Sequence, residues 1–260
     1  MYNLSAYILT HNSEKYLSEI LKSLEKVADE ILIIDSGSND NTEQIAKSFD
    51  KVNFIVHPFS NFKSQRTFAA DSCKFDYVLF LDSDELPDEN FILGLIGLKE
   101  SGFDNDAYVA ERHWNILGKD ISVFYPIVSP DFPIRLYNKK LVNFNNSSLV
   151  HETPDGFKTK GRLNGKLQHI SFENKEIMES KLQLYTNIAA ADLILKNKKL
   201  SKFRAFASAI SAFIKWYFFK KGFLDGLIGL TLGKYAYRYS LLKYIKAIKL
   251  REKQHQSTSS

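Results

Sequence analysis

The sequence predicts an α/β domain built on a parallel β-sheet and followed by a basic helical extension. The first 110 residues alternate short β-type runs with helix-like stretches, which is the rhythm of βαβ units. From Lys175 onward the pattern is helical. The chain has 260 residues, of which 44% are hydrophobic and 25% charged, so it can bury a substantial core and is neither disordered nor fibrous.

The elements of the first half follow from the spacing of apolar residues. Leu17, Ile20 and Leu24 recur at helical spacing, and Ser13 before them is a suitable N-cap. Residues 31–34 form a continuous apolar run, which is typical of a strand buried on both faces. We expect strands at 4–9, 30–35, 53–57 and 77–81 and helices at 13–27, 42–49 and 62–73.

The second half changes character. Shorter strands are expected at 108–113, 133–137 and 166–170, separated by loops rich in Asn, Ser, Gly and Pro where a substrate pocket would be built. Helices are expected at 175–195, 202–219 and 223–250, and the polar residues 254–260 are expected to be disordered.

Three carboxylates follow the strand at 77–81. Asp82, Asp84 and Glu85 fall within four residues, at the strand end where open α/β sheets bind their ligands. Asp82 and Asp84 could hold one divalent cation between them, and hard oxygen ligands select Mg²⁺ or Mn²⁺. The alternative is a solvated loop leading to a helix capped by Asp88.

A second polar turn follows the strand at 30–35. Asp35 can accept hydrogen bonds from a base or ribose, as carboxylates do in dinucleotide sites; the alternative is an ordinary turn whose Asp and Ser residues cap the next helix. Neither GxGxxG nor a P-loop motif occurs, which argues against a dinucleotide dehydrogenase and a P-loop NTPase. The single cysteine, Cys73, excludes an internal disulfide and a cysteine-based zinc site.

Taken in order, four segments resemble the nucleotide-sugar glycosyltransferases of family 2, which have the GT-A fold. The segments are Thr10-His11-Asn12, residues 35–40, Gln65-Arg66 and residues 81–85. Further segments resemble the lipopolysaccharide core β-1,4-glucosyltransferase branch of that family: Arg135-Leu136-Tyr137, Val150-His151-Glu152, residues 163–169 and residues 222–226. The resemblance implies a GT-A catalytic domain over 1–174, with a nucleotide-binding half (1–85) and an acceptor half (86–174), then a helical extension over 175–253.

The resemblance also implies roles for single residues. Those expected to bind the nucleotide sugar are Thr10, Asn12, Asp35, Ser36, Arg66 and Asp82. Asp82 and Asp84 would hold Mg²⁺ or Mn²⁺, with His169 as a further ligand, and the cation would stabilise the leaving diphosphate.

Family 2 enzymes invert the anomeric centre in one displacement, so a carboxylate must take the proton of the acceptor hydroxyl. We expect Glu152 to be this base. Asp131 is the alternative, and Glu111 is a third candidate.

The implied function is transfer of a hexose, with glucose from UDP-glucose as the expected donor, to a lipid-linked acceptor during synthesis of lipopolysaccharide or lipooligosaccharide core or another surface glycan. A second hypothesis is a non-catalytic sugar-nucleotide or glycan-binding protein that kept the fold. The sequence leaves the oligomeric state open.

The charge is unevenly distributed along the chain. The net charge of +5 consists of −8 over residues 1–195 and +13 over residues 196–260. Basic and aromatic residues interleave over 202–251, a composition typical of helices that lie on an anionic membrane. The longest apolar stretch, residues 205–219, is too short to span one. We therefore expect a cytoplasmic protein, with no signal peptide, attached peripherally to the inner membrane.

Two alternatives remain for the basic extension. It could simply pack on the catalytic domain with its lysines in solvent, or it could bind single-stranded nucleic acid. The acidic first 195 residues would repel a polyanion, which argues against a nucleic-acid partner.

Overall fold

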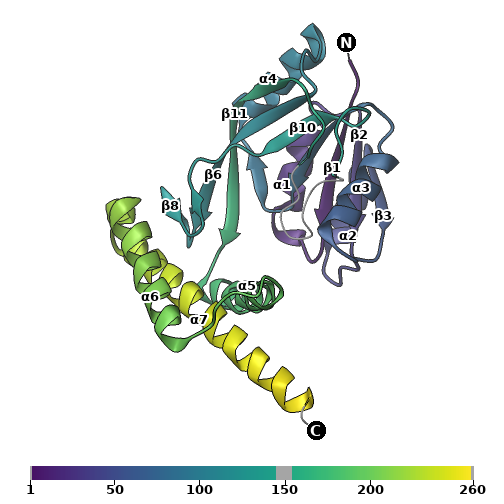
Figure 1. Cartoon of the computed structure of the whole chain (residues 1–260). Helices are drawn as coiled ribbons and strands as arrows, with labels where there is room; N and C mark the ends of the chain where they lie inside the picture. The colour runs from purple at the N-terminus through teal and green to yellow at the C-terminus, as the bar shows by residue number, and fades with distance from the viewer. Residues whose placement is uncertain (1, 145–153, 259–260) are drawn as a thin grey trace. The chain divides into compact units, whose positions relative to one another are not determined.

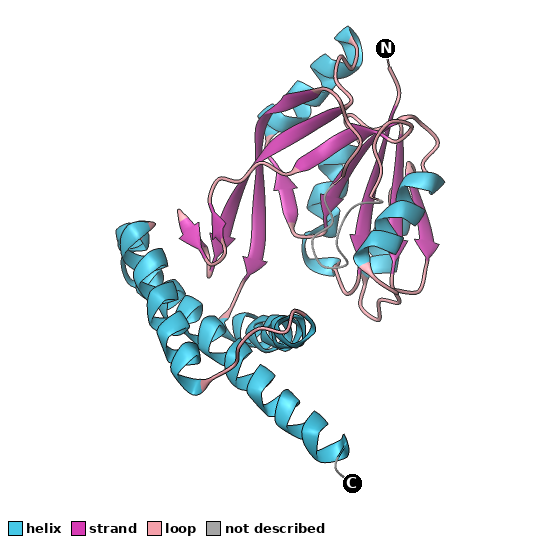
Figure 2. Ribbon diagram, viewed as in Figure 1, coloured by secondary structure: helices cyan, strands magenta, loops and turns pink. Residues whose placement is uncertain are grey.

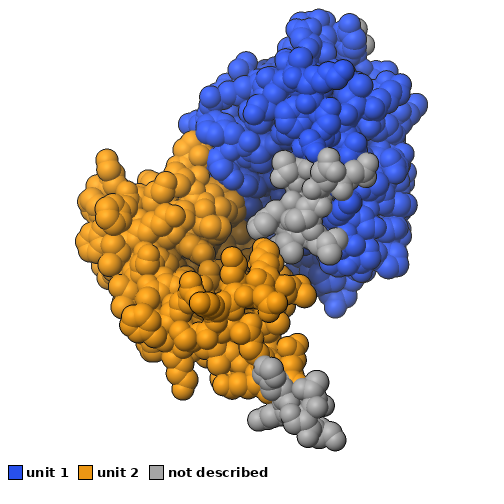
Figure 3. Space-filling view, viewed as in Figure 1, with its two compact units in different colours: residues 1–113, 131–170 blue, residues 114–130, 171–260 orange. Residues whose placement is uncertain are grey.

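The computed structural model describes residues 2–144 and 154–258. The chain forms two compact units, one of residues 1–113 and 131–170 and the other of residues 114–130 and 171–260 (Figures 1 and 3). The strands of the sheet belong mainly to the first unit, and the C-terminal helices belong to the second (Figure 2).

A parallel sheet forms one half of the first unit. Its strands are parallel and lie in the order β3-β2-β1-β4, the order of a doubly wound sheet in which the strand order switches between β1 and β4. The register sets Thr10 of β1 opposite Asp35 of β2, and Leu9 of β1 opposite Asp82 of β4. These strands are β1 (Leu4–Thr10), β2 (Glu30–Asp35), β3 (Val52–Val56) and β4 (Tyr77–Asp82).

Antiparallel strands extend the sheet beyond β4. β10 pairs with β4 and with β6, and β11 follows. The short strand β5 pairs antiparallel with β11, which sets His169 opposite Glu85 immediately after β4 ends. The strands are β5 (Glu85–Pro87), β6 (Ala107–Ile116), β10 (Ile134–Asn138) and β11 (Lys160–Phe172).

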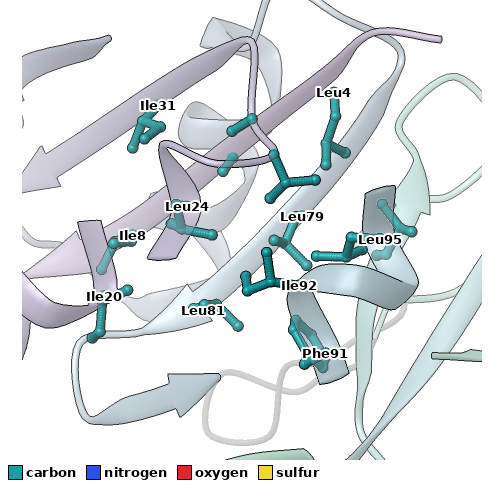
Figure 4. Packing of buried hydrophobic residues seen from close by; sticks show 14 of the residues in the cluster. Leu4, Ile8, Ile20, Leu24, Ile31, Leu79, Leu81, Phe91, Ile92 and Leu95 are labelled. Carbon is teal, nitrogen blue, oxygen red and sulfur yellow. The ribbon is translucent and has the colours of Figure 1, made fainter. Parts of the chain in front are cut away.

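Apolar side chains on both faces of the parallel strands form the core of the first unit. Leu79 and Leu81 of β4 join a cluster with α1, α2 and α4, shown in part in Figure 4, whereas Val78 and Phe80 join a second cluster with α3. This alternation explains why these strands are continuous apolar runs. The helices are α1 (Glu14–Leu24), α2 (Thr42–Lys47), α3 (Phe62–Ser72) and α4 (Glu89–Ser101).

The second unit packs three short strands with the C-terminal helices. Its core includes Trp114, Phe124, Phe172, Leu182 and Tyr235. In the described part of the chain, none of the helices combines the length and the apolar character needed to cross a membrane. The elements are β7 (Lys119–Asp120), β8 (Val123–Phe124), β9 (Ile127–Val128), α5 (Lys175–Leu195), α6 (Lys202–Phe213), the π-helix η1 (Ile214–Phe219), the 3₁₀-helix η2 (Gly222–Asp225) and α7 (Gly226–Thr258).

Most expected elements are present with shifted ends, and α5 has the predicted bounds. The expected helix at 202–219 is wrong in type over its last third, because hydrogen bonds of the π class, such as Lys220 N–H to the Lys215 carbonyl at 2.8 Å, replace the α pattern. α7 continues to Thr258, beyond the expected end near Leu250 and into the polar segment expected to be disordered.

Candidate active site

The carboxyl ends of three neighbouring strands bring the predicted site residues together. Thr10, Asp35 and Asp82 end β1, β2 and β4, and β1 lies between the other two strands. Open α/β sheets bind ligands outside this edge. The register of the sheet therefore places these side chains on one edge, although they lie up to 72 residues apart in the sequence.

Asp35 organises the turn that follows β2. Its carboxylate is 2% exposed and accepts hydrogen bonds from the hydroxyl of Thr10 (2.8 Å), the backbone N–H of Gly37 (2.9 Å), and the backbone N–H and hydroxyl of Ser38 (2.8 and 2.5 Å). Burial alone would raise the pKa of Asp35, but these hydrogen bonds outweigh burial and lower the pKa below its ordinary value. The carboxylate is thus ionised at neutral pH and already occupied with shaping the turn.

Side chains after β1 join this turn to the acidic segment after β4. Asn12 has a positive φ of 51°; its backbone N–H donates to the Ser38 hydroxyl (2.8 Å) and its side-chain oxygen accepts from the Asn39 N–H (2.9 Å). Ser13 is the N-cap residue of α1, as predicted, although its side chain makes no cap hydrogen bond. Its hydroxyl instead donates to the Ser83 hydroxyl (3.0 Å).

Helix α3 contacts the same edge through Gln65 and Arg66. The Ser36 hydroxyl accepts a hydrogen bond at 3.0 Å from the buried side chain of Gln65. The next residue, Arg66, donates from Nη2 to Oδ1 of Asp82 at 2.7 Å. The Gln65-Arg66 pair therefore connects α3 to the ends of both β2 and β4.

Two arginines hold the carboxylate of Asp82. Arg66 contacts one oxygen, and Nη2 of Arg135 donates to the other at 3.0 Å. Both guanidinium carbons lie 4.7 Å from the ring centroid of Phe80, within cation–π range. Burial would raise the pKa of Asp82, but the positive charges of Arg66 and Arg135 hold it far below the ordinary value.

Glu85 is the fully buried centre of the same ion network. It accepts two hydrogen bonds from Arg135 (2.7 and 2.5 Å) and one from Arg112 (2.8 Å), and Arg112 in turn forms a bidentate pair with Asp131 (2.9 and 2.6 Å). Burial and Asp82 would raise the pKa of Glu85, but the two arginines lower it. The carboxylate is therefore a buried ion whose charge is balanced by guanidinium groups.

The roles of Glu85, Arg112 and Arg135 in this network are not among those predicted from the sequence. One signal pointed to Arg135: it interrupts an apolar strand, and an arginine on a buried strand needs a buried anion. Glu85, directly after the Asp82–Asp84 pair, is such an anion. Arg112 carries no such signal, because Glu111 and His113 flank it in β6.

Asp84 lies beside the predicted metal ligand His169. Nε2 of His169 is 3.2 Å from Oδ1 of Asp84, because β5 pairs with β11 and the Ile170 N–H bonds to the Asp84 carbonyl at 2.9 Å. The Asp84 side chain is 31% exposed. Within the described residues, no three His, Cys, Asp or Glu side chains converge as a ready-made metal cage.

This donor set fits the implied cation. Mg²⁺ usually keeps several waters and takes one or two protein carboxylates together with substrate phosphates, so it does not require a complete protein cage. Asp84 offers an accessible carboxylate with an imidazole beside it, whereas both oxygens of Asp82 accept from arginines.

The three candidate bases differ in their surroundings and in whether the structure describes them. Glu152, the expected base, lies outside the described residues. Asp131 is held in the bidentate pair with Arg112. Glu111 accepts from His113 and Arg162, and these hydrogen bonds, the first of them from His113, lower its pKa below the ordinary value.

The order of the strands in the sheet is that of the GT-A fold. A crystal structure of TarS from S. aureus in complex with UDP-GlcNAc has the same fold, with a TM-score of 0.50 and 18% identity over 96% of this chain and 92% of that one. The chain belongs to glycosyltransferase family 2, because the sequence model described as Glycosyl transferase family 2 matches residues 5–155. It is therefore a glycosyltransferase, as the sequence motifs predicted.

Two relatives extend the comparison. A protein of Rickettsia typhi described as an uncharacterized glycosyltransferase is 29% identical over 97% of this chain and 88% of its own length. A lipopolysaccharide core biosynthesis glycosyltransferase, LpsC of Rhizobium meliloti, is 36% identical over 33% of each chain.

Proposed function

We propose that this glycosyltransferase moves a hexose, with glucose from UDP-glucose as the leading donor, onto a lipid-linked acceptor in synthesis of lipopolysaccharide core or a related surface glycan. The observation that carries the proposal is the single edge formed by Thr10, Asp35 and Asp82, with Arg66 and Arg135 beside it. The likeness to LpsC supports the acceptor class, and that to TarS, whose structure holds UDP-GlcNAc, supports a UDP-sugar donor. We place the reaction at the cytoplasmic face of the inner membrane.

The residues of the edge would divide the work of binding the donor. Thr10, Asn12 and Ser36 frame the turn around Asp35, where the nucleoside would bind. Arg66 lies at the Asp82 end, where its guanidinium would face the diphosphate. Bidentate guanidinium contacts suit phosphate oxygens, so the donor would lie from β2 across to β4.

A Mg²⁺ or Mn²⁺ ion would be held by Asp84, with Asp82 and His169 beside it. Such a cation supplies Lewis-acid stabilisation of the leaving diphosphate. The protein itself would supply the Asp84 carboxylate just after β4, and the β5–β11 pairing would hold His169 next to it.

The first experiment is a screen of UDP- and GDP-linked sugars for release of the nucleoside diphosphate, with Mn²⁺ and with or without a membrane extract. We expect UDP release from UDP-glucose to increase when the extract supplies acceptor. Absence of release from every donor, together with unchanged UDP binding after Asp82→Ala, would contradict the enzyme mechanism proposed for this edge.

For the base, we propose Glu152, because Asp131 and Glu111 already accept from arginines. Glu152→Gln should reduce transfer by about a hundredfold or more, the scale of a lost general base, while UDP binding measured by calorimetry stays unchanged. Glu43→Gln is the matched control, since it makes the same chemical change at an exposed carboxylate paired with Lys47, and it should keep nearly full activity. Full transfer by Glu152→Gln would move the assignment to Asp131.

A further inference from the structure

Helix α6 buries a stripe of three alanines and exposes most of its large apolar side chains. Ala205, Ala209 and Ala212 form the buried stripe, which packs with α7. The opposite stripe carries Phe203 (84% exposed) and Ile210 (52% exposed). A helix of a water-facing domain normally buries its large apolar residues, so the reversed pattern marks a surface made for contact.

The exposed stripe continues past the end of α6. The π-helix η1 buries Trp216, which leaves both Phe218 and Phe219 exposed. The stripe and its continuation form one surface, here named the apolar face: Phe203, Phe206, Ile210, Ile214, Phe218, Phe219, Phe223, Leu224 and Leu227.

Two glycines hold the tip of the apolar face against α7. A Cβ at Gly222 would lie 2.7 Å from the Trp216 carbonyl oxygen, and a Cβ at Gly229 would lie 1.8 Å from the Gly222 carbonyl oxygen. Both contacts are with backbone atoms, so only glycine permits the close approach. The exposed side chains at the tip are therefore carried by a tightly packed turn.

An open apolar groove lies in the same surface. It has a volume of about 500 Å³ and is lined by Ala207, Ile210, Ser211, Ile214, Lys215 and Phe219. A groove of this size and lining can receive hydrocarbon, and one lysine at its edge adds a positive charge.

Positive charge surrounds the apolar face. Residues 196–224 contain eight Lys or Arg and no Asp or Glu. Among them, Lys202, Arg204, Lys215, Lys220 and Lys221 are exposed. Exposed aromatic and aliphatic residues with a basic border are the combination that anionic bilayers bind.

We propose that the apolar face is the membrane-binding surface of this enzyme, with its Phe and Ile side chains at the boundary of the lipid headgroups and acyl chains and its lysines on anionic headgroups. The inference refines the membrane location of the proposed function by naming the surface. A second copy of the chain fits less well, because a two-fold symmetric contact would set this basic border against itself.

The test is binding to phosphatidylcholine vesicles with and without phosphatidylglycerol, measured by co-sedimentation on the full chain. We expect binding that requires the anionic lipid. Phe206→Ser with Ile210→Ser should weaken it at least about tenfold, because two inserted side chains are lost. The matched control is Leu184→Ser with Ile188→Ser on α5, where exposure is similar (55% and 40%, against 50% and 52%). The control should bind as the wild type does.

Two further measurements test the membrane-binding surface independently of the proposed transferase activity. Lys220→Glu with Lys221→Glu changes only exposed residues and should also reduce vesicle binding, which tests the surface even if the serine variant fails to fold. UDP release without vesicles should be unchanged in every variant, and its absence from the wild type would weaken the proposed function without touching vesicle binding. Two results would overturn the inference. One is that the Phe206→Ser with Ile210→Ser variant and the Lys220→Glu with Lys221→Glu variant bind vesicles as well as the wild type does. The other is that the wild type binds no vesicles but self-associates, and that Phe206→Ser with Ile210→Ser abolishes the self-association.

Discussion

Asp84→Asn should reduce metal-dependent UDP release by roughly a hundred- to a thousandfold, the range seen when one preorganised charge-stabilising group is removed. The Asp84 carboxylate is partly exposed, and its described ion-pair contact is with His169 rather than with an arginine. The substitution keeps the shape of the side chain and removes its charge. The melting temperature should therefore stay close to that of the wild type, while turnover with Mn²⁺ falls.

The comparison with Asp82→Asn makes the Asp84 result specific. Asp82 pairs with two arginines, so its substitution should lower both turnover and melting temperature. Asp76→Asn, at a surface ion pair with Lys140, should change neither. Turnover of Asp84→Asn within tenfold of the wild type would show that this carboxylate does not serve the reaction.

Glu85→Gln should destabilise the protein by about 3–5 kcal/mol, the usual result of removing one partner from a buried ion pair. The side chain is fully buried and accepts from Arg112 and Arg135, which would be left without their shared anion. Urea unfolding followed by circular dichroism measures the loss. The surface control Glu43→Gln, which removes an exposed pair with Lys47, should change the free energy of unfolding by no more than about 1 kcal/mol.

The same substitution has a pH signature. The pKa of Glu85 in the folded protein is depressed, so its stabilisation is complete above the ordinary glutamate pKa of about 4.3 and is lost as the pH falls through the lower, folded value. The stability difference between wild type and Glu85→Gln should therefore be constant at pH 6–7, near neutrality, and shrink on acidification below about pH 4. A difference that does not change with pH would show that the carboxylate is not ionised in the folded protein.

The sequence was informative where function depends on strand ends and weaker where it depends on distant partners. Asp35 and Asp82 could be predicted because an acid directly after an apolar run lies at the ligand-binding edge of a parallel sheet. The partners of Glu85 could not, since Arg112 and Arg135 lie 27 and 50 residues further on. Only the strand order β4-β10-β6 brings them together, and local periodicity carries no information on strand order.

Tertiary contacts change the local structure at two places where the sequence predicts a helix start and a helix. Ser13 stands at the helix start, as its type suggests, but the nearby Ser83 offers its hydroxyl a tertiary partner. The helix at 202–219 has the expected amphipathic residues, yet Trp216 is buried by a shift into π-helix that no residue pattern announces. In both cases tertiary packing overrides local propensity.

Salt should affect the ion network of the first unit and the exposed lysines of the second unit to different extents. From Arg66 through Asp82, Arg135, Glu85 and Arg112 to Asp131, three cations alternate with three anions, so the network is formally neutral and supplies its own counterions. Buried pairs are screened little by dissolved ions, whereas exposed lysines are screened strongly. The site edge should thus keep its geometry in concentrated salt, whereas the lipid binding proposed for the helical unit should weaken. A salt wash is therefore expected to release the protein from anionic vesicles while UDP release is retained.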